Sequence, residues 1–405
     1  MTATTMLRVN EPREIISLLP YRLGFRPRDS AVAVSLRAPR GRVGVVMRVD
    51  LAALGDPEAG SQVARAMVAA MGRDGARSTV LVAYTERDPR AGTSPGVEPG
   101  LEPDGALVAR AVTHYRDAAE ASLGSVPVWV VTSAGYLAYD CARSCCPPGG
   151  RPLRELESTQ VSARMVLEGA SIAGSRDDLV RIPSADAQRR RVVARTRRRW
   201  HERRVEALAD GQDALVRWRL DSVAAWRAAV DLVAGRAPVG APAPWGRLEA
   251  GLEDRRVRDA VLASFVPGVG DLAERSVRGL RPSPGIDEAM AQVSARIMGS
   301  EAGIPAPEGV VRLYEETLEA LVAHGRRRAQ APALSLLALL AWWRGDGARA
   351  QILLDRALQD DPEYRLAVLL DSALAAGLGP GWARRREPVD DEDDAPGGAL
   401  EPTAG

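Results

Sequence analysis

The period of the hydrophobic pattern changes once along this 405-residue chain, just beyond the adjacent cysteines Cys145 and Cys146. Before that point several segments alternate with a period of two or form short apolar runs, which is typical of β-strands. From Leu153 onward, apolar residues recur at three- and four-residue spacing, which predicts helices. We therefore expect an α/β domain with a small mixed sheet over residues 1–152, followed by a larger all-helical domain over residues 153–380.

Four segments of the first part carry the strand pattern. Residues 30–36 and 42–51 flank a proline–glycine turn and are expected to form an antiparallel hairpin. Residues 79–84 and 126–131 are continuous apolar runs, as strands buried on both faces are. A helix is predicted between them, at residues 105–123, so this pair should be parallel with a right-handed crossover.

The remaining helices are predicted from their period and from the proline- and glycine-rich segments that separate them. A short helix over residues 11–19 is expected to end before Pro20, because proline lacks the amide hydrogen that continues a helix. In the second part, helices are predicted at residues 158–168, 176–181, 186–208, 214–233, 247–264, 286–297 and 308–323.

The clearest helical pattern lies in residues 331–364. An apolar helix over residues 333–343, a turn containing Gly345 and Gly347, a second helix over residues 348–359 and a stop at Pro362 describe a helical hairpin. Its small and leucine residues match one tetratricopeptide unit. Because such an array needs about three units to stand alone, we expect this hairpin to belong to a helical core instead of forming a peptide-binding groove. Residues 381–405 are charged and poor in large apolar side chains, and are expected to be a disordered acidic tail.

Composition excludes several kinds of chemistry. The chain has no lysine, so a P-loop, a pyridoxal Schiff base and a protein-kinase phosphate contact are all excluded. Its histidines, His114, His201 and His324, are far apart and form no HExxH pair. The net charge of +1 gives no long-range attraction to nucleic acid or to a membrane. No secretory signal, membrane-spanning run or disulfide framework is evident, so we expect a soluble cytoplasmic protein without a cofactor.

The end of the parallel strand pair is the best candidate for a pocket, because open α/β sheets bind ligands beyond the carboxyl ends of their parallel strands. These ends lead into residues 85–88 and 132–135, and a cysteine-containing loop follows closely. The candidate pocket residues are Glu86, Asp88, Ser133, Cys141, Cys145 and Cys146. The alternative is that the two carboxylates are solvated loop charges.

The three cysteines of this loop could supply thiolates to zinc. Their Cys-x3-Cys-Cys spacing differs from the paired CxxC spacing of zinc ribbons and fingers. Adjacent cysteines rarely bind one tetrahedral ion without strain, and a fourth ligand is not evident nearby. A reactive thiol and a packed structural turn are the alternatives, and we assign no metal.

Arginine clusters provide two further candidates. Arg22 and Arg26 precede the first predicted strand, while Arg48 and Asp50 share a face of the second. Guanidinium groups there could bind a phosphate or carboxylate. The preferred alternative is a fixed turn together with a surface ion pair that contributes little to stability.

The second cluster is the arginine-rich helix predicted at residues 186–208. Its candidate nucleic-acid contacts are Arg190, Arg191, Arg195 and Arg198, since affinity for nucleic acid comes largely from phosphate contacts. Helical projection scatters the arginines of this segment around the axis. Together with the near-neutral net charge, this makes nucleic-acid binding a less favoured hypothesis.

Several stretches resemble a known family. The stretches are Leu19-Pro-Tyr-Arg-Leu-Gly-Phe-Arg-Pro-Arg-Asp-Ser30, Arg48-Val-Asp-Leu51, Cys145-Cys-Pro-Pro148 with Arg151-Pro-Leu153, an Ala-Trp-Trp-Arg-Gly-Asp-Gly segment and Asp361-Pro-Glu-Tyr-Arg-Leu-Ala367. They are similar to the actinobacterial domain-of-unknown-function 4192 family, over about residues 7–378. The resemblance implies an actinobacterial origin and no established activity, and it transfers no catalytic residues.

No nucleophile–base pair, carboxylate dyad, metal motif or phosphate loop can be assembled from these residues. We therefore expect a non-catalytic protein that binds a small molecule or a protein partner. One alternative is a hydrolase or phosphate-handling enzyme with its site at the sheet edge, near Glu86, Ser133 and Cys145. The other is nucleic-acid binding through the arginine-rich helix.

Overall fold

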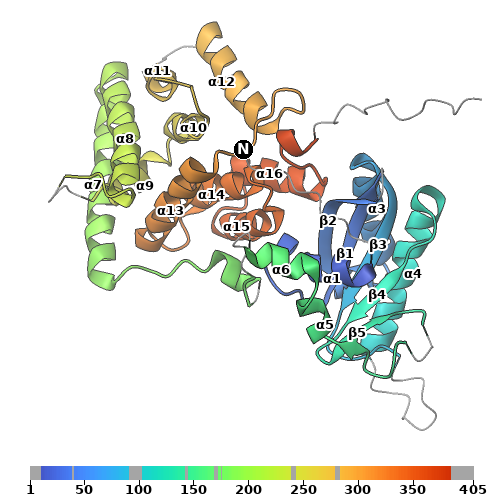
Figure 1. Ribbon diagram of the computed structural model, residues 1–405. Coiled ribbons are helices and arrows are strands. Elements are labelled where there is room, and N and C mark those ends of the chain that lie inside the picture. Colours follow the sequence, from blue (N-terminus) through green and yellow to red (C-terminus); the bar gives the residue numbers. More distant parts are fainter. Residues whose placement is uncertain are drawn as a thin grey trace, which may run out of the picture.

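The computed structural model describes residues 11–38, 41–90, 103–141, 145–167, 172–174, 176–238, 243–278 and 283–384. A sheet-bearing N-terminal part is followed by a mostly helical part (Figure 1), as the change of period predicts. Residues 385–405, which hold most of the predicted acidic tail, lie outside the described residues.

Six strands form one mixed sheet in the order β2-β1-β3-β4-β5-β6. Their bounds are β1 (Ser30–Arg37), β2 (Arg42–Asp50), β3 (Ala76–Tyr84), β4 (Val128–Val131), β5 (Gly135–Ala138) and β6 (Arg151–Pro152). The antiparallel β1–β2 hairpin and the parallel β3–β4 pair are both confirmed. The other strand pairs are antiparallel, and β5 and β6 were not predicted.

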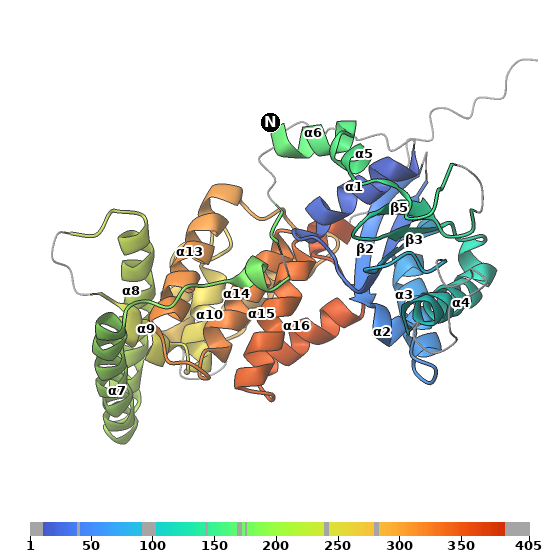
Figure 2. The same cartoon turned by 90° about the horizontal axis from the view of Figure 1, so that it is seen from below.

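Helices cover both faces of this sheet (Figures 1 and 2). Apolar residues of α3 (Gly60–Arg73) and α4 (Pro103–Leu123) pack with one face, beside the short helix α2 (Leu51–Leu54). The other face is covered by α1 (Pro12–Leu23), against which α5 (Arg154–Glu157) and α6 (Gln160–Leu167) pack. Each face therefore has its own apolar core.

The prediction that the first helix ends before Pro20 was wrong. Helix α1 includes Pro20 and continues to Leu23. Proline removes one backbone hydrogen bond, but Leu19 and Leu23 are both buried in the core of the sheet, which stabilises the extra turn. Gly24 ends the helix with a left-handed backbone at φ 76°, the conformation that glycine adopts readily.

A buried carboxylate fixes an irregularity at the edge of the sheet. The β1–β2 register shifts between Val34 and Leu36. There the carboxylate of Asp74, which follows α3, accepts hydrogen bonds from the Val45 amide at 2.9 Å and from the Ser35 hydroxyl at 2.6 Å. Arg37 Nε donates to the same carboxylate at 2.8 Å. At this bulge some polar groups have no partner on the neighbouring strand, and the Asp74 carboxylate accepts their hydrogen bonds instead.

Among the described residues of the second part, helices are the only multi-residue secondary-structure elements. Its elements are η2 (Asp177–Val180), α7 (Ala187–Ala209), α8 (Gln212–Val233), α9 (Trp245–Gly251), α10 (Arg255–Ala263), α11 (Leu272–Arg278), α12 (Pro284–Met298), α13 (Glu308–His324), α14 (Ala331–Trp343), α15 (Gly347–Asp360), α16 (Arg365–Ala375) and η3 (Gly381–Arg384). The single helix predicted over residues 247–264 is two helices. Asp254 separates them, because its side chain accepts the Arg256 and Val257 amides and so caps α10.

The predicted helical hairpin is confirmed as α14 and α15. Almost every side chain of α14 is buried, so this helix is the centre of the largest apolar core. In both views α14, α15 and α16 lie between the sheet and α7–α9 (Figures 1 and 2). The likeness of the hairpin to a tetratricopeptide unit stays a prediction.

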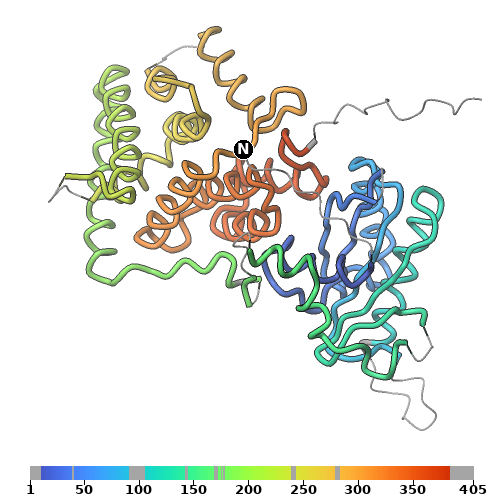
Figure 3. The backbone as a smooth tube through the Cα atoms, in the orientation of Figure 1, coloured from blue at the N-terminus to red at the C-terminus, as the bar shows by residue number. Residues whose placement is uncertain are grey.

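The two parts of the chain contact each other at several points. Arg73 of α3 donates to the Ala376 carbonyl, and Ala348 of α15 packs against the apolar core that α1 forms with the sheet. Residues 172–174 and 176–186 run between the two parts, alongside the helices (Figure 3). None of the described helices combines the length and the apolar character needed to cross a membrane.

Candidate functional site

A cavity lined by arginines lies in the helical part, where segments distant in sequence meet. Its volume is about 220 Å³. The walls come from the residues before α7, from α7 itself, from the end of α13 with the following loop, and from α14 and α15. The lining residues are Ile182, Ser184, Arg190, Val322, Ala323, Gly325, Arg327, Arg328, Gln330, Leu334, Arg356, Gln359 and Asp360.

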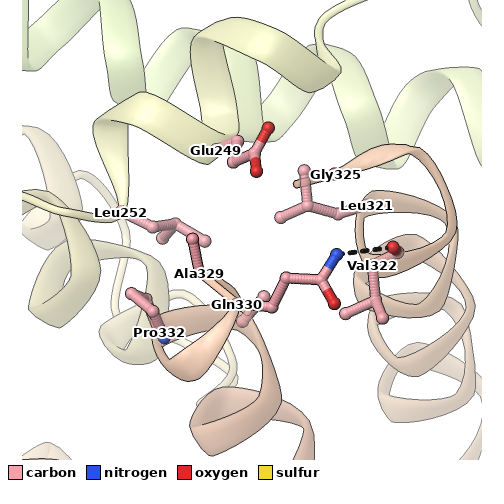
Figure 4. Close-up of a pocket in the computed structure, with 9 residues that line it drawn as sticks. Glu249, Leu252, Leu321, Val322, Gly325, Ala329, Gln330 and Pro332 are labelled. Carbon is pink, nitrogen blue, oxygen red and sulfur yellow. Dashed lines mark hydrogen bonds between the residues drawn. The ribbon is translucent and has the colours of Figure 1, made fainter. Parts of the chain in front are cut away.

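The loop between α13 and α14, residues 325–330, shapes this cavity. Gln330 fixes its end, since its amide donates to Asp360 at 2.9 Å and its side chain donates to the Val322 carbonyl at 2.7 Å (Figure 4). At Gly325 an added Cβ would lie 2.9 Å from the Gln330 side chain, so a larger residue would move the loop. Arg328 adopts a left-handed backbone with φ 57°, which costs energy for a residue with a side chain and often marks a functional segment.

The arginines that line the cavity have no carboxylate partners among the described residues. Arg356 donates to the Val180 carbonyl at 2.9 Å, and Arg327 lies 3.5 Å from the Ser184 hydroxyl. Within the described part of the chain, none of the four lining arginines forms an ion pair. The lining contains four arginines, of which Arg327 and Arg328 are exposed, and a single carboxylate, that of Asp360, so its formal net charge is +3.

A buried carboxylate supports the loop from the opposite side. Glu249 of α9 accepts the Arg326 amide at 2.7 Å, next to a small hollow of about 10 Å³ that Figure 4 shows. Burial raises the pKa of Glu249, although the hydrogen bond from Arg326 and the charge of Arg197 oppose the rise. Its second oxygen has no hydrogen-bond partner among the described residues. Glu249 therefore positions the loop at an energetic cost.

Of the four residues predicted to contact nucleic acid, one belongs to this cavity. Arg190 is half-buried in its wall. Arg191, Arg195 and Arg198 are exposed on α7, at a spacing that places them on one side of the helix. Arg190 thus lines the cavity, whereas the other three arginines lie on the exposed surface of α7.

The predicted sheet-edge pocket is brought together only in part. Asp88 accepts hydrogen bonds from Arg90 and from the Gly149 amide at 3.2 Å, so it is joined to the cysteine loop. Burial raises the pKa of Asp88, but the hydrogen bonds from Arg90 and Gly149 together outweigh burial, so the pKa lies below its usual value. Glu86 and Ser133 are exposed, and their contact runs from the Ser133 hydroxyl to the Glu86 carbonyl at 2.9 Å. A hydrolase with Ser133 as its nucleophile would need a general base next to the serine hydroxyl, and the described residues provide none.

The three cysteines converge. Their sulfur atoms all lie within 4.8 Å of one another, and the Cys141 and Cys145 sulfurs are 3.3 Å apart. The structure describes all three residues and joins none of them in a disulfide. The hydrogen bond with Cys141, together with burial and the neighbouring thiols, raises the pKa of the Cys145 thiol.

The arginines predicted as a second anion site are mostly paired already. Arg48 pairs with Asp50 at 2.6 Å and donates to the Ser30 hydroxyl at 2.8 Å. Arg26 lies 3.6 Å from Glu157 of α5, and Arg22 is exposed at the end of α1. Burial lowers the pKa of Arg48, while Asp50 opposes the shift. This arrangement agrees with the ion-pair alternative better than with an anion site.

Comparisons with known proteins give one match. A family model, described as "Domain of unknown function (DUF4192)", matches residues 12–381. No curated protein and no solved structure matches the chain. The resemblance seen in the sequence motifs is thereby confirmed, and the chain belongs to the domain-of-unknown-function 4192 family.

Proposed function

We propose that this protein is a non-catalytic binding protein whose cavity holds a small molecule carrying a phosphoryl group. The observation that carries the proposal is the set of four arginines, Arg190, Arg327, Arg328 and Arg356, that line one cavity without carboxylate partners among the described residues. Like charges of this kind repel one another in the empty state. An anion between them removes that repulsion and accepts their hydrogen bonds.

Charge and size favour a phosphoryl group over a single carboxylate. A phosphoryl group bears a charge of about −1.5 to −2 and three acceptor oxygens, which complements a lining of +3. At about 30 Å³ for each water, the volume of about 220 Å³ corresponds to roughly seven waters. A phosphoryl group and part of the molecule that carries it can occupy this space.

The geometry supports binding more than catalysis. The uncharged polar groups of the lining are Ser184, Gln330 and Gln359, and its single carboxylate, Asp360, accepts the Gln330 amide. Guanidinium groups bind phosphate oxygens through several parallel hydrogen bonds but do not exchange protons near neutral pH. The expectations of a cytoplasmic location and an actinobacterial origin are consistent with such a protein and stay expectations.

The test is a calorimetric titration of the full chain in a phosphate-free buffer, with inorganic phosphate, pyrophosphate and acetate as probes. We expect the phosphorus-containing anions to bind and acetate to bind more weakly. Because one hydrogen bond to a charged group contributes about 1.5–3 kcal/mol, Arg190→Ala and Arg356→Ala should each weaken binding by roughly 10- to 150-fold.

Arg198→Ala is the matched control, since it removes an exposed arginine from the same helix as Arg190. It should leave the affinity within about twofold of the parent protein. Equal losses in Arg190→Ala and Arg198→Ala would mean that the cavity is not the site. The proposal also fails if neither phosphate nor pyrophosphate binds.

Nucleic-acid binding gives a different result in the same set of variants. If duplex DNA is retained in a salt-dependent mobility assay, and the loss follows substitution of Arg191, Arg195 and Arg198 but not of Arg190, the exposed side of α7 is the functional surface. That outcome would replace the cavity with a phosphate-backbone contact.

A further inference from the structure

The sulfur atoms of the cysteine loop lie at spacings close to those of thiolates around one metal ion. Four sulfur ligands placed tetrahedrally at about 2.3 Å from a zinc ion lie about 3.8 Å from one another. The three cysteine sulfurs, which all lie within 4.8 Å of one another with one pair at 3.3 Å, span this value. A disulfide would require about 2.05 Å, so the observed spacing suits a shared ion better than a covalent bond.

One arginine closes the loop that carries these sulfurs. Arg90 donates to the Cys141 carbonyl at 2.7 Å and to the Pro147 carbonyl at 3.3 Å. These two carbonyls lie at the beginning and just beyond the end of the segment that holds the three thiols. A single guanidinium therefore brings Cys141 close to Cys145 and Cys146, although these residues are separated in sequence.

Asp88 in turn holds Arg90. Its carboxylate accepts Arg90 Nε and Nη2 at 3.0 and 2.9 Å, and it also accepts the Gly149 amide. The Asp88 and Arg90 side chains are 9% and 22% exposed, so the pair is well fixed. Supporting contacts of this kind, behind the atoms that bind the metal, orient ligands in known metal sites.

The exposure of the three thiols differs in a way that fits a bound ion. Cys146 is buried in the core between the sheet and α4, Cys141 is half-buried and Cys145 is exposed. The three sulfur atoms thus extend from the core to the surface, and an ion can reach them from the solvent side. The adjacent residues Cys145 and Cys146 therefore bring their sulfur atoms close together although one side chain is exposed and the other is buried.

We propose that Cys141, Cys145 and Cys146 bind one Zn²⁺ ion as thiolates, with a fourth ligand from outside this trio. Thiolates are soft ligands that select zinc and copper(I) over magnesium and calcium. Binding of Zn²⁺ to three thiols releases three protons and leaves a complex with a charge of −1, whereas copper(I) would leave −2. The smaller residual charge favours zinc beside a core that is largely apolar.

The experiment uses the full chain, purified under reducing conditions. We expect about one equivalent of zinc by elemental analysis after incubation with Zn²⁺ and dialysis. Cobalt(II) should give the strong near-ultraviolet absorption of thiolate-to-metal charge transfer. Cys145 is exposed and Cys141 is half-buried, so a thiol reagent should modify these two thiols in the folded apoprotein and react far more slowly with them after zinc is added.

Variants separate a metal site from a packed turn. Cys145→Ser removes an exposed ligand and should abolish stoichiometric zinc binding. Arg90→Ala keeps all three thiols and should weaken zinc binding by about 10- to 100-fold. Arg87→Ala is the matched control, because it removes an exposed arginine from the same segment and should bind zinc like the parent.

Three results would overturn the proposal. One is a folded protein whose three thiols react equally with and without zinc. Another is a native Cys141–Cys145 disulfide, found by mass spectrometry after alkylation without reductant. The third is a reduced protein that retains no zinc after incubation with Zn²⁺ and dialysis. If Cys145→Ser fails to fold, the titrations of the parent and of Arg90→Ala still decide the matter.

Discussion

Removing the Asp74 carboxylate tests how strongly the β1–β2 hairpin depends on one buried side chain. The Asp74 side chain is 6% exposed. In Asp74→Ala, the Val45 amide and the buried Ser35 hydroxyl lose their acceptor. Each unsatisfied buried donor costs about 1–3 kcal/mol. Arg37 is 38% exposed and can turn to water, so it adds little. We expect a total loss of about 3 kcal/mol.

The appropriate assay is native-state hydrogen exchange, because the chain has two differently built parts and a single unfolding transition cannot be assumed. A loss of about 3 kcal/mol corresponds to an increase of roughly 150-fold in the exchange rates of the β2 amides. Amides of α14 should change little, since that helix belongs to another core. Asp74→Asn keeps one acceptor oxygen and should lie between the parent and Asp74→Ala.

Asp56→Ala is the matched control. Asp56 also accepts two backbone amides, those of Glu58 and Ala59, but it does so in solvent. Water replaces an exposed acceptor readily, so its loss should be clearly smaller than that of Asp74→Ala. Equal effects in the two variants, or an effect of Asp74→Ala that spreads evenly over both parts of the chain, would refute the argument from burial.

Three further predictions concern the helical core, the cysteine loop and a buried acid. Burial raises the pKa of Glu249, so the folded state binds its proton more tightly than the unfolded state. The free energy of unfolding should therefore fall as pH rises from the unfolded pKa to the raised folded one, and Glu249→Gln should flatten that slope in denaturation at several pH values. Gly150→Ala should destabilise the protein by about 1–3 kcal/mol, because φ is 84° and its Cβ would meet the backbone of β5. Gly124→Ala, with φ 69° in open space, should cost less, and similar melting of the two would contradict the prediction. Leu337→Ala should cost about 2–5 kcal/mol by urea denaturation, whereas Leu369→Ala, 58% exposed, should be nearly neutral.

The fold was predictable where a segment carries its own period. The strands β1 to β4 and the α14–α15 hairpin are long enough for their patterns to be read locally. The four residues of β4 belong to a longer apolar run over residues 126–131, whereas β5 has four residues that begin with a glycine and β6 has two, so β5 and β6 were missed. The break between α9 and α10 was also missed. Asp254 caps α10 because its side chain accepts two backbone amides, and the sequence does not show the orientation of that side chain.

The candidate sites depend on contacts that no local pattern encodes. The cavity gathers arginines from α7, from the α13–α14 loop and from α15, and each is unremarkable in an arginine-rich chain. The triplet of arginines at residues 326–328, next to Gly325, was the signal that could have indicated the loop. Likewise the three cysteines were identified from the sequence, but their closure by Arg90 follows only from the path of the chain after β3.

The position of α14, α15 and α16 has a consequence for biosynthesis. These are the last of the described α-helices to leave the ribosome, yet they fill the space between the sheet and α7–α9 (Figures 1 and 2). A nascent chain that ends at α13 has made the outer layers but lacks the apolar helix on which the largest core is built. Its flanking helices would expose that surface until α14 to α16 have been synthesised, and such transiently exposed apolar surface makes a nascent chain prone to aggregation.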